Sequence, residues 1–191
     1  MELPAEIILC EVGLRDGLQN ENKILETSDK LAIANDLINA GFKVIELGSF
    51  MSPKAVPQMA DTDELFLNLQ GIENVELRAL IANKKGAERA INCGCKKVKL
   101  NVSASLKHNL ANINMTPEES MTKFEEIYNL ATEHGINVSG SISMPFGSPW
   151  EGRISLESIE KIVEAYIEGG IDEISLSDAS GMAVPNQDYL I

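Results

Sequence analysis

Apolar residues along the chain follow two spacings that alternate from one end to the other. Short, nearly continuous apolar runs, which are typical of buried strands, occupy residues 6–12, 43–50, 75–82, 96–103, 136–143 and 171–178. Between them, apolar residues three and four positions apart predict helices over 27–42, 61–70, 83–94, 116–135 and 155–170. Regular alternation of strand and helix predicts an α/β fold around a parallel sheet.

The predicted helix ends agree with this division. Thr27 or Ser28 can cap the first helix, and Gly41 can close it. The helix over 116–135 begins with Thr116, Pro117 and Glu119, which match a capping box, and it ends at Gly135. Pro185 predicts the start of one more helix, which would run to Ile191.

Two architectures fit six strands of this kind: a doubly wound open sheet and a (β/α)₈ TIM barrel. The segment after the first strand, EVGLRDGLQN, lacks the G-x-G-x-x-G pattern of dinucleotide-binding sheets. Polar residues also cluster where several different strands end, and a barrel gathers such ends around one mouth. These residues are Arg15, Asp16, Glu46, Ser49, Asn101, Ser143 and Asp178. The barrel is therefore favoured, with about six βα units, so residues 1–191 are expected to form a partial catalytic domain unless a partner or swapped copy completes it.

Composition narrows the functional classes. The sequence has 191 residues, 44% of them hydrophobic, and a formal net charge of −13, which argues against nucleic acid or an anionic membrane as a partner. No apolar run is long enough to span a membrane and the first residues do not resemble a targeting peptide, so a cytoplasmic location is expected.

The three cysteines are too few for a disulfide framework. Cys93 and Cys95 lie just before a strand and lack further ligands at zinc-like spacing, so packing at a helix end is favoured over a metal site. Cys10 falls in the first apolar run and is predicted to lie in the core.

Arg15 and Asp16 are adjacent opposite charges at the end of the first predicted strand. The Asp16-Gly17 pair alone would suit a solvated turn. However, VGLRDGLQNE (12–21), GFKVIELGSFMSPKAVPQMAD (41–61) and EISLSDASG (173–181) together resemble the hydroxymethylglutaryl-CoA lyase family of metal-dependent TIM-barrel enzymes. The resemblance extends over nearly the whole chain, although the family's domain is longer.

This resemblance implies a lyase that cleaves 3-hydroxy-3-methylglutaryl-CoA into acetyl-CoA and acetoacetate. It further implies an acyl-CoA substrate, a divalent cation (Mg²⁺ or Mn²⁺), a homodimer, and a place in leucine degradation and ketone-body formation. A cation with oxygen ligands can hold the hydroxyl and carboxylate of such a substrate, and a fixed guanidinium can stabilise the charge that develops on it.

By the same resemblance, Asp16 is the expected metal ligand, and Arg15, Glu46 and Asp178 are the expected catalytic residues. Arg15 would polarise a substrate oxygen, Glu46 would act as an acid or as the partner of Arg15, and Asp178 is a candidate base. Gln19 and Ser49 are expected to bind substrate. Gly17 is expected to let the backbone bend so that neighbouring side chains reach one site.

Among the other polar candidates, His134 at a helix end is predicted to be structural, and Lys54 is as compatible with a solvated position as with contact to an anion. His108 follows the fourth strand, where a role in a substrate loop stays open.

The sequence departs from the family in two ways. The family's histidine ligands and its catalytic cysteine come later than Ile191, so the 191-residue chain is expected to be inactive alone. The family's Thr after the strand-six Asp is Ala179 here, which leaves the acyl group open; Ser180 could replace its hydroxyl. A related aldolase or acyl-CoA-condensing synthase and a non-catalytic barrel fragment are the alternatives. Reading the gene past Ile191 would discriminate between them.

Overall fold

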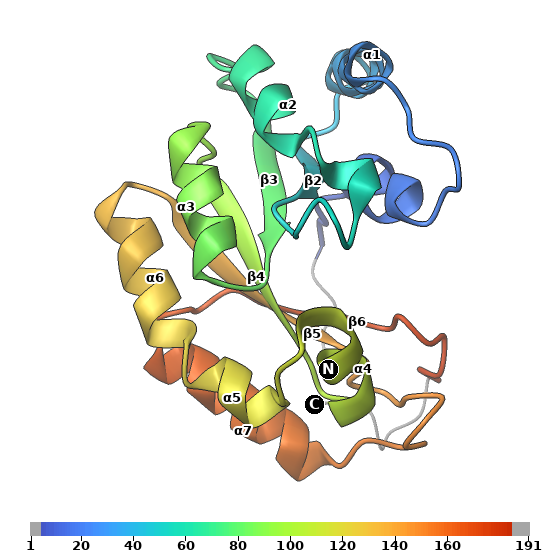
Figure 1. Ribbon diagram of the computed structural model, residues 1–191, viewed down its shortest axis with the longest axis vertical. Coiled ribbons are helices and arrows are strands. Elements are labelled where there is room, and N and C mark those ends of the chain that lie inside the picture. Colours follow the sequence, from blue (N-terminus) through green and yellow to red (C-terminus); the bar gives the residue numbers. More distant parts are fainter. Residues whose placement is uncertain (1–4, 185–191) are drawn as a thin grey trace. The chain divides into compact units, whose positions relative to one another are not determined.

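The computed structural model describes residues 5–184 (Figure 1). Its strands are β1 (Cys10–Glu11), β2 (Val44–Ser49), β3 (Glu76–Ile81), β4 (Lys97–Ser103), β5 (Asn137–Ser143) and β6 (Ile174–Ser177). Its α-helices are α1 (Thr27–Asn39), α2 (Thr62–Asn68), α3 (Lys84–Asn92), α4 (Leu106–Ile113), α5 (Pro117–Met121), α6 (Phe124–Glu133) and α7 (Leu156–Glu168). A π-helical turn, η1 (Gly13–Gly17), and a 3₁₀ turn, η2 (Pro57–Met59), complete the described elements. The helix expected from Pro185 to Ile191 lies outside the described residues.

The strands form a six-stranded sheet in chain order, β1-β2-β3-β4-β5-β6. The β1–β2, β2–β3 and β5–β6 pairs are parallel. A doubly wound sheet reverses its strand order at a switch point, whereas a barrel adds strands in sequence. The observed strand order is therefore that of a barrel and not that of a doubly wound sheet.

The chain consists of two compact units. The first comprises Met1–Ile81, Lys85–Val98 and His134–Asn137, and the second comprises Ala82–Lys84, Lys99–Glu133 and Val138–Ile191. In the first unit, α2 packs on β2 and on α1 (Figure 1). Its core combines buried side chains of β2, β3 and α2, and the rings of Phe50 and Phe66 lie 5.7 Å apart.

In the second unit, α7 packs against α5 and α6 (Figure 1). Tyr166 of α7 is fully buried, and its ring stacks on Phe124 with centroids 4.2 Å apart. The Tyr166 hydroxyl lies 2.8 Å from the Leu100 carbonyl oxygen and 3.0 Å from that of Ser141, so it bonds to β4 and β5. Gly140 leaves room for this ring, because a Cβ there would lie 3.1 Å from three ring atoms, a tight contact.

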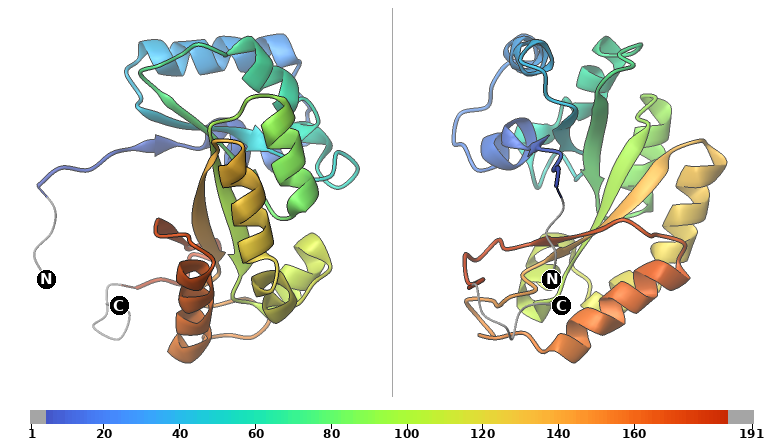
Figure 2. Two further views of the ribbon diagram at one scale, coloured as in Figure 1. Left: turned by 90° about the vertical axis from the view of Figure 1, so that its left-hand side faces the viewer. Right: turned by 180° about the vertical axis from the view of Figure 1, so that it is seen from behind.

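The first strand was predicted wrongly. Only Cys10 and Glu11 pair with β2, and Ile7, Ile8 and Leu9 are exposed rather than buried. Cys10 is exposed too, not part of the core. The segment before β1 runs outward, and no strand of the described chain pairs with it (deep blue in Figure 2). An apolar run is buried only where both of its faces are covered, and that cover is absent from the described residues.

Two further helix predictions need correction. The helix expected over 116–135 is broken into α5 and α6, because Lys123 N–H bonds to the Ser120 carbonyl and the Thr122 hydroxyl to the Glu119 carbonyl. Thr116 and Glu119 do form the expected capping box. The first helix is preceded by Glu26, with no side-chain cap from Thr27 or Ser28.

Candidate active site

Arg15 and Asp16 lie on the π-helical turn η1, directly after β1. The N–H groups of both residues donate to the Val12 carbonyl oxygen, at 3.1 and 2.7 Å. The strand therefore coils as it ends, and this lets two consecutive side chains lie near each other. Gly17 does not explain the bend as expected, since it lacks a positive φ and a Cβ there would meet no atom within 4 Å.

The Arg15 guanidinium joins two carboxylates. Its Nε donates to Glu46 Oε1, and its Nη1 donates to Asp16 Oδ1 at 2.7 Å. The Glu46 side chain is fully buried, the Arg15 side chain is 16% exposed and the Asp16 side chain is 59% exposed. Nη2 makes no hydrogen bond within the described part of the chain. The group is thus fixed by a buried acid, and its free nitrogen can meet an anionic ligand.

Glu46 lies in the middle of β2, whose six residues are all buried. A fully buried carboxylate is expensive unless a cation or hydrogen-bond donors accompany it. The alternative of a solvated surface glutamate is excluded by this burial, and Arg15 supplies the cation. The catalytic role expected for the pair stays a prediction.

Ser49 at the end of β2 is completely buried, and its hydroxyl oxygen has no hydrogen-bond partner in the described residues. Its carbonyl oxygen does accept a bond from the Thr62 hydroxyl, at 3.1 Å. Gly48 permits this approach, since a Cβ there would lie 2.5 Å from Thr62 Oγ1. An unsatisfied buried hydroxyl costs about 1–3 kcal/mol, and a polar substrate group would remove that cost. Gln19, the other expected substrate residue, is half-buried on the turn after η1.

Two cations that the sequence pattern did not reveal hold the loop that follows β2. Lys30 of α1 is 2% exposed, and its ammonium donates to the Gln58 carbonyl at 2.7 Å and to Asp61 Oδ1 at 2.6 Å. Thr27 donates its hydroxyl to the other Asp61 oxygen, at 2.9 Å. The available signal was the place of Lys30 four residues before the buried Ala34, on the apolar face of α1.

Arg89 of α3 anchors the start of the same loop. Its Nη1 donates to the Met51 carbonyl at 2.9 Å, its Nη2 pairs with Asp63, and its guanidinium lies 5.3 Å from the Phe50 ring centroid. Lys54, at the middle of the loop, is exposed.

Asp178 belongs to the second unit and follows β6. Its two carboxylate oxygens accept the N–H groups of Met182 and Ala183, at 3.0 and 3.1 Å, so the acid shapes the loop after the strand. The Ser180 hydroxyl donates to the Gly147 carbonyl at 2.8 Å. Whether Asp178 meets Arg15 and Asp16 stays a prediction, because Asp178 and the other two residues lie in different units.

The other residues considered from the sequence, Cys93, Cys95 and His134, lie outside the candidate site. Cys93 and Cys95 are buried at the end of α3 as expected, and burial raises the pKa of Cys95 to about 12. His134 is exposed after α6. Across residues 5–184, no three His, Cys, Asp or Glu side chains gather as a metal site would require. No described helix has the length and apolarity that crossing a bilayer would demand.

Comparison with known proteins decides the family. The HMGL-like family model matches residues 6–190. The chain belongs to the HMGL-like family. It is 39% identical over 183 residues to the mitochondrial hydroxymethylglutaryl-CoA lyase of Macaca fascicularis, covering 96% of this chain and 56% of that protein. It is 38% identical to the 3-hydroxy-3-isohexenylglutaryl-CoA/hydroxymethylglutaryl-CoA lyase of Pseudomonas aeruginosa, covering 95% of this chain and 61% of that protein.

Solved HMGL-like structures have the same fold. An HMG-CoA lyase from Acinetobacter baumannii, in complex with coenzyme A and 3-methylmalate, superposes with a TM-score of 0.89 at 39% identity, covering 93% of this chain and 58% of that one. The Pseudomonas aeruginosa hydroxymethylglutaryl-CoA lyase gives 0.89 at 38% identity, covering 96% and 61%. The predicted fold class, an incomplete TIM barrel, is confirmed, with six strands among the described residues. The chain spans a little over half the length of these two curated relatives, 56% of one and 61% of the other.

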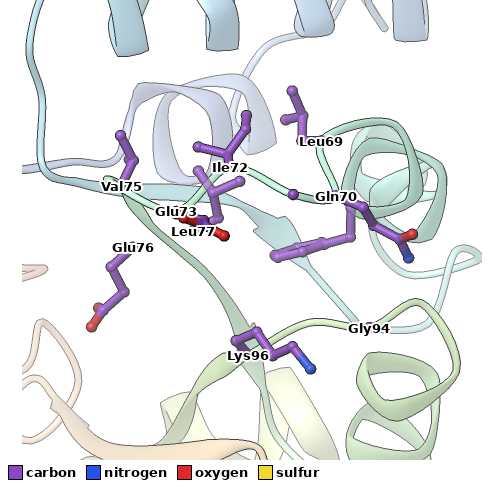
Figure 3. A pocket seen from close by; sticks show the side chains of 11 residues that line it. Leu69, Gln70, Ile72, Glu73, Val75, Glu76, Leu77, Gly94 and Lys96 are labelled. Atoms are coloured by element: carbon purple, nitrogen blue, oxygen red, sulfur yellow. The ribbon is translucent and has the colours of Figure 1, made fainter.

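The described pocket of this HMGL-like chain lies away from Arg15. It has a volume of about 610 Å³ in the first unit, and its wall includes Leu69, Ile72 and Leu77, with Glu76 and Lys96 among its charged residues (Figure 3). It lies at the amino-terminal ends of β3 and β4, whereas Ser49 is the last residue at the opposite, carboxyl-terminal end of β2. None of the expected site residues lines it, so its geometry adds nothing to the lyase hypothesis.

Proposed function

We propose that this chain forms the first six βα units of a hydroxymethylglutaryl-CoA lyase, which cleaves 3-hydroxy-3-methylglutaryl-CoA into acetyl-CoA and acetoacetate. The observation that supports it most is the Arg15 guanidinium, fixed by the fully buried Glu46 and adjoining the exposed Asp16. This arrangement occurs in a chain that is 39% identical to a lyase over nearly its whole length.

The reaction needs two charge movements. The hydroxyl on C3 loses its proton, the C2–C3 bond breaks, and its electron pair becomes the enolate of the thioester, which then takes up a proton. Arg15 is suited to the developing negative charge, because Nε and Nη1 are occupied and Nη2 can face the substrate oxygen. Glu46 keeps the guanidinium in that orientation, as positioning residues must do within a few tenths of an ångström.

Asp16 is the candidate ligand for a divalent cation, Mg²⁺ or Mn²⁺. Its carboxylate is 59% exposed and accepts one bond, from Arg15, so oxygen lone pairs remain for a hard cation. Such a cation would polarise the hydroxyl and carboxylate of the substrate. One carboxylate supplies only part of a coordination shell, which fits the expectation that the 191-residue chain is inactive alone.

Asp178 remains the candidate base for the C3 hydroxyl, and Ser49 and Gln19 remain candidate substrate contacts. The enclosed Ser49 hydroxyl supports its assignment, since a ligand would satisfy it. The Ser180 hydroxyl bonds to a backbone carbonyl, which weighs against it as a replacement for the family's threonine at Ala179.

The test is a chimera in which residues 6–184 replace the matching segment of the Pseudomonas aeruginosa lyase. We expect it to form acetoacetate and acetyl-CoA with Mn²⁺, and we expect the 191-residue chain alone to be inactive. Arg15→Gln in the chimera should lower kcat by about 10²–10³-fold, as loss of one charge-stabilising donor does. The control Lys43→Gln, an exposed lysine at the opposite end of β2, should leave kcat unchanged.

A folded chimera without turnover, or an Arg15→Gln chimera with normal turnover, would overturn the proposal. Turnover by the 191-residue chain alone would refute only its expected inactivity. We further propose a homodimer in a cytoplasmic setting, with a role in leucine degradation and ketone-body formation. Light scattering of the chimera tests the dimer, and fractionation of the native cells tests the location.

A further inference from the structure

Trp150, the single tryptophan of the sequence, is half-exposed on the turn after β5 (51% of its surface). The imidazole of His108, on α4 after β4, lies beside it. Their ring centroids are 6.1 Å apart and their planes differ by 27°. Both residues belong to the second unit. The two rings come from segments about forty residues apart, and Trp150 leaves about half of its surface open to solvent; we name this pair the His108–Trp150 platform.

Glu151 fixes the platform. Its Oε2 accepts the hydroxyls of Ser105 and Ser148, each at 2.5 Å, and its Oε1 accepts the Lys107 N–H at 3.0 Å. The turn that carries Trp150 is thereby tied to the first turn of α4, which carries His108. The three donors stabilise the ionised form of this carboxylate and hold it in place.

The electrostatics of the platform suit a planar, electron-rich ring with phosphates attached. Burial lowers the pKa of His108, although the Glu151 carboxylate opposes this, so the imidazole is mostly neutral at pH 7 and behaves as an aromatic ring. Lys107 is exposed on the segment that carries His108. Cationic side chains beside an exposed aromatic face form the usual binding surface of a nucleotide.

We propose that the His108–Trp150 platform stacks the purine ring of the coenzyme A substrate, with Lys107 facing its phosphates. The choice of ligand rests on the proposed lyase function, since an acyl-CoA is the nucleotide-containing substrate of that reaction. A stack on one face of Trp150 adds affinity but takes no part in bond cleavage.

The experiment uses the fluorescence of the full 191-residue chain, in which Trp150 is the only tryptophan. Coenzyme A and adenosine 3′,5′-bisphosphate should quench it with a Kd of about 1 mM or tighter, and pantetheine, which lacks the purine, should not. His108→Ala should weaken coenzyme A binding about tenfold. By calorimetry, Trp150→Ala should weaken it similarly and Trp150→Phe should restore it. His134→Ala, the other histidine, is the control and should bind normally.

Absence of quenching by coenzyme A, equal quenching by pantetheine, or normal binding by both alanine variants would overturn the platform. The lyase proposal fails separately. If the chimera cleaves substrate and its Trp150→Ala variant has an unchanged KM, the platform alone is refuted. If the purine binds but the chimera shows no turnover, the lyase proposal is refuted and the platform proposal stands.

Discussion

Lys30→Met is the substitution whose effect follows most directly from the structure. The Lys30 side chain is 2% exposed, and its ammonium has two partners, the Asp61 carboxylate and the Gln58 carbonyl. Methionine fills nearly the same volume as the aliphatic part of lysine, so the packing of α1 is retained. The change removes one charge and two hydrogen bonds with little disturbance of shape.

The loss of unfolding free energy in Lys30→Met depends on the interactions that Asp61 retains. Removing one partner of a buried ion pair typically costs about 3–5 kcal/mol, because the other charge is left in a poor solvent. Asp61 is 18% exposed and still accepts the Thr27 hydroxyl, so water and one donor reduce the penalty. We expect about 2–3 kcal/mol, which corresponds to a fall in Tm of about 4–12 °C for a chain of this length.

The assay is urea unfolding of the 191-residue chain, followed by far-ultraviolet circular dichroism. The double variant Lys30→Met/Asp61→Asn should regain at least half of the lost stability, because its neutral amide no longer needs a cation and can still accept from Thr27. Lys161→Met, which removes the exposed pair with Glu157 on α7, should be indistinguishable from the parent chain. A Lys30→Met loss below about 1 kcal/mol, or a double variant as unstable as the sum of its parts, would refute the buried clamp.

Three more outcomes are expected. Thr116→Ala removes the capping box of α5 and should lower the unfolding free energy by about 1 kcal/mol in the same urea assay. Tyr166→Phe leaves the carbonyls of β4 and β5 without their buried donor and should cost about 1–3 kcal/mol, which a preserved urea midpoint would contradict. With a thiol reagent at pH 8, Cys10 should react at once, whereas Cys93 and Cys95 should react only after unfolding, since burial raises the pKa of both thiols. Because the pKa of Cys95 is higher in the folded chain, its share of the stability is complete below about pH 9 and declines as the pH rises toward 12.

The sequence pattern could predict the alternating topology because each βα unit is a local signal. Glu46 was found for a related reason: an acid inside the apolar run VIELGS is conspicuous, and burial in a strand demands a cation. Arg15 was conspicuous because it adjoins the opposite charge of Asp16, but the π-helical turn that brings their side chains together leaves no mark in the sequence.

The helix α4 was missed because its polarity is inverted. Its apolar residues Leu106 and Leu110 are exposed, and the side chain buried beneath it is Asn109. Asn109 accepts the Ser103 N–H and donates to the Met115 carbonyl and the Ser120 hydroxyl. A helix held by a buried amide has no apolar stripe for a periodicity argument to detect.

Among the polar groups that lack a hydrogen-bond partner within residues 5–184 are the Arg15 Nη2 and the buried Ser49 hydroxyl, and both lie where neighbouring strands end. Arg15 lies on the turn directly after β1. Ser49, with its enclosed hydroxyl, is the last residue of β2, which pairs with β1. The enclosed Ser49 hydroxyl lowers the stability of the chain, and folding alone supplies no reason to retain it. A donor-rich guanidinium and a hydroxyl are also the groups that an anionic, hydroxylated substrate can satisfy. The folding cost of the Ser49 hydroxyl favours a ligand site over a scaffold fragment, because a scaffold could replace Ser49 with a small apolar residue and become more stable. Arg15 differs, since it also neutralises the buried Glu46.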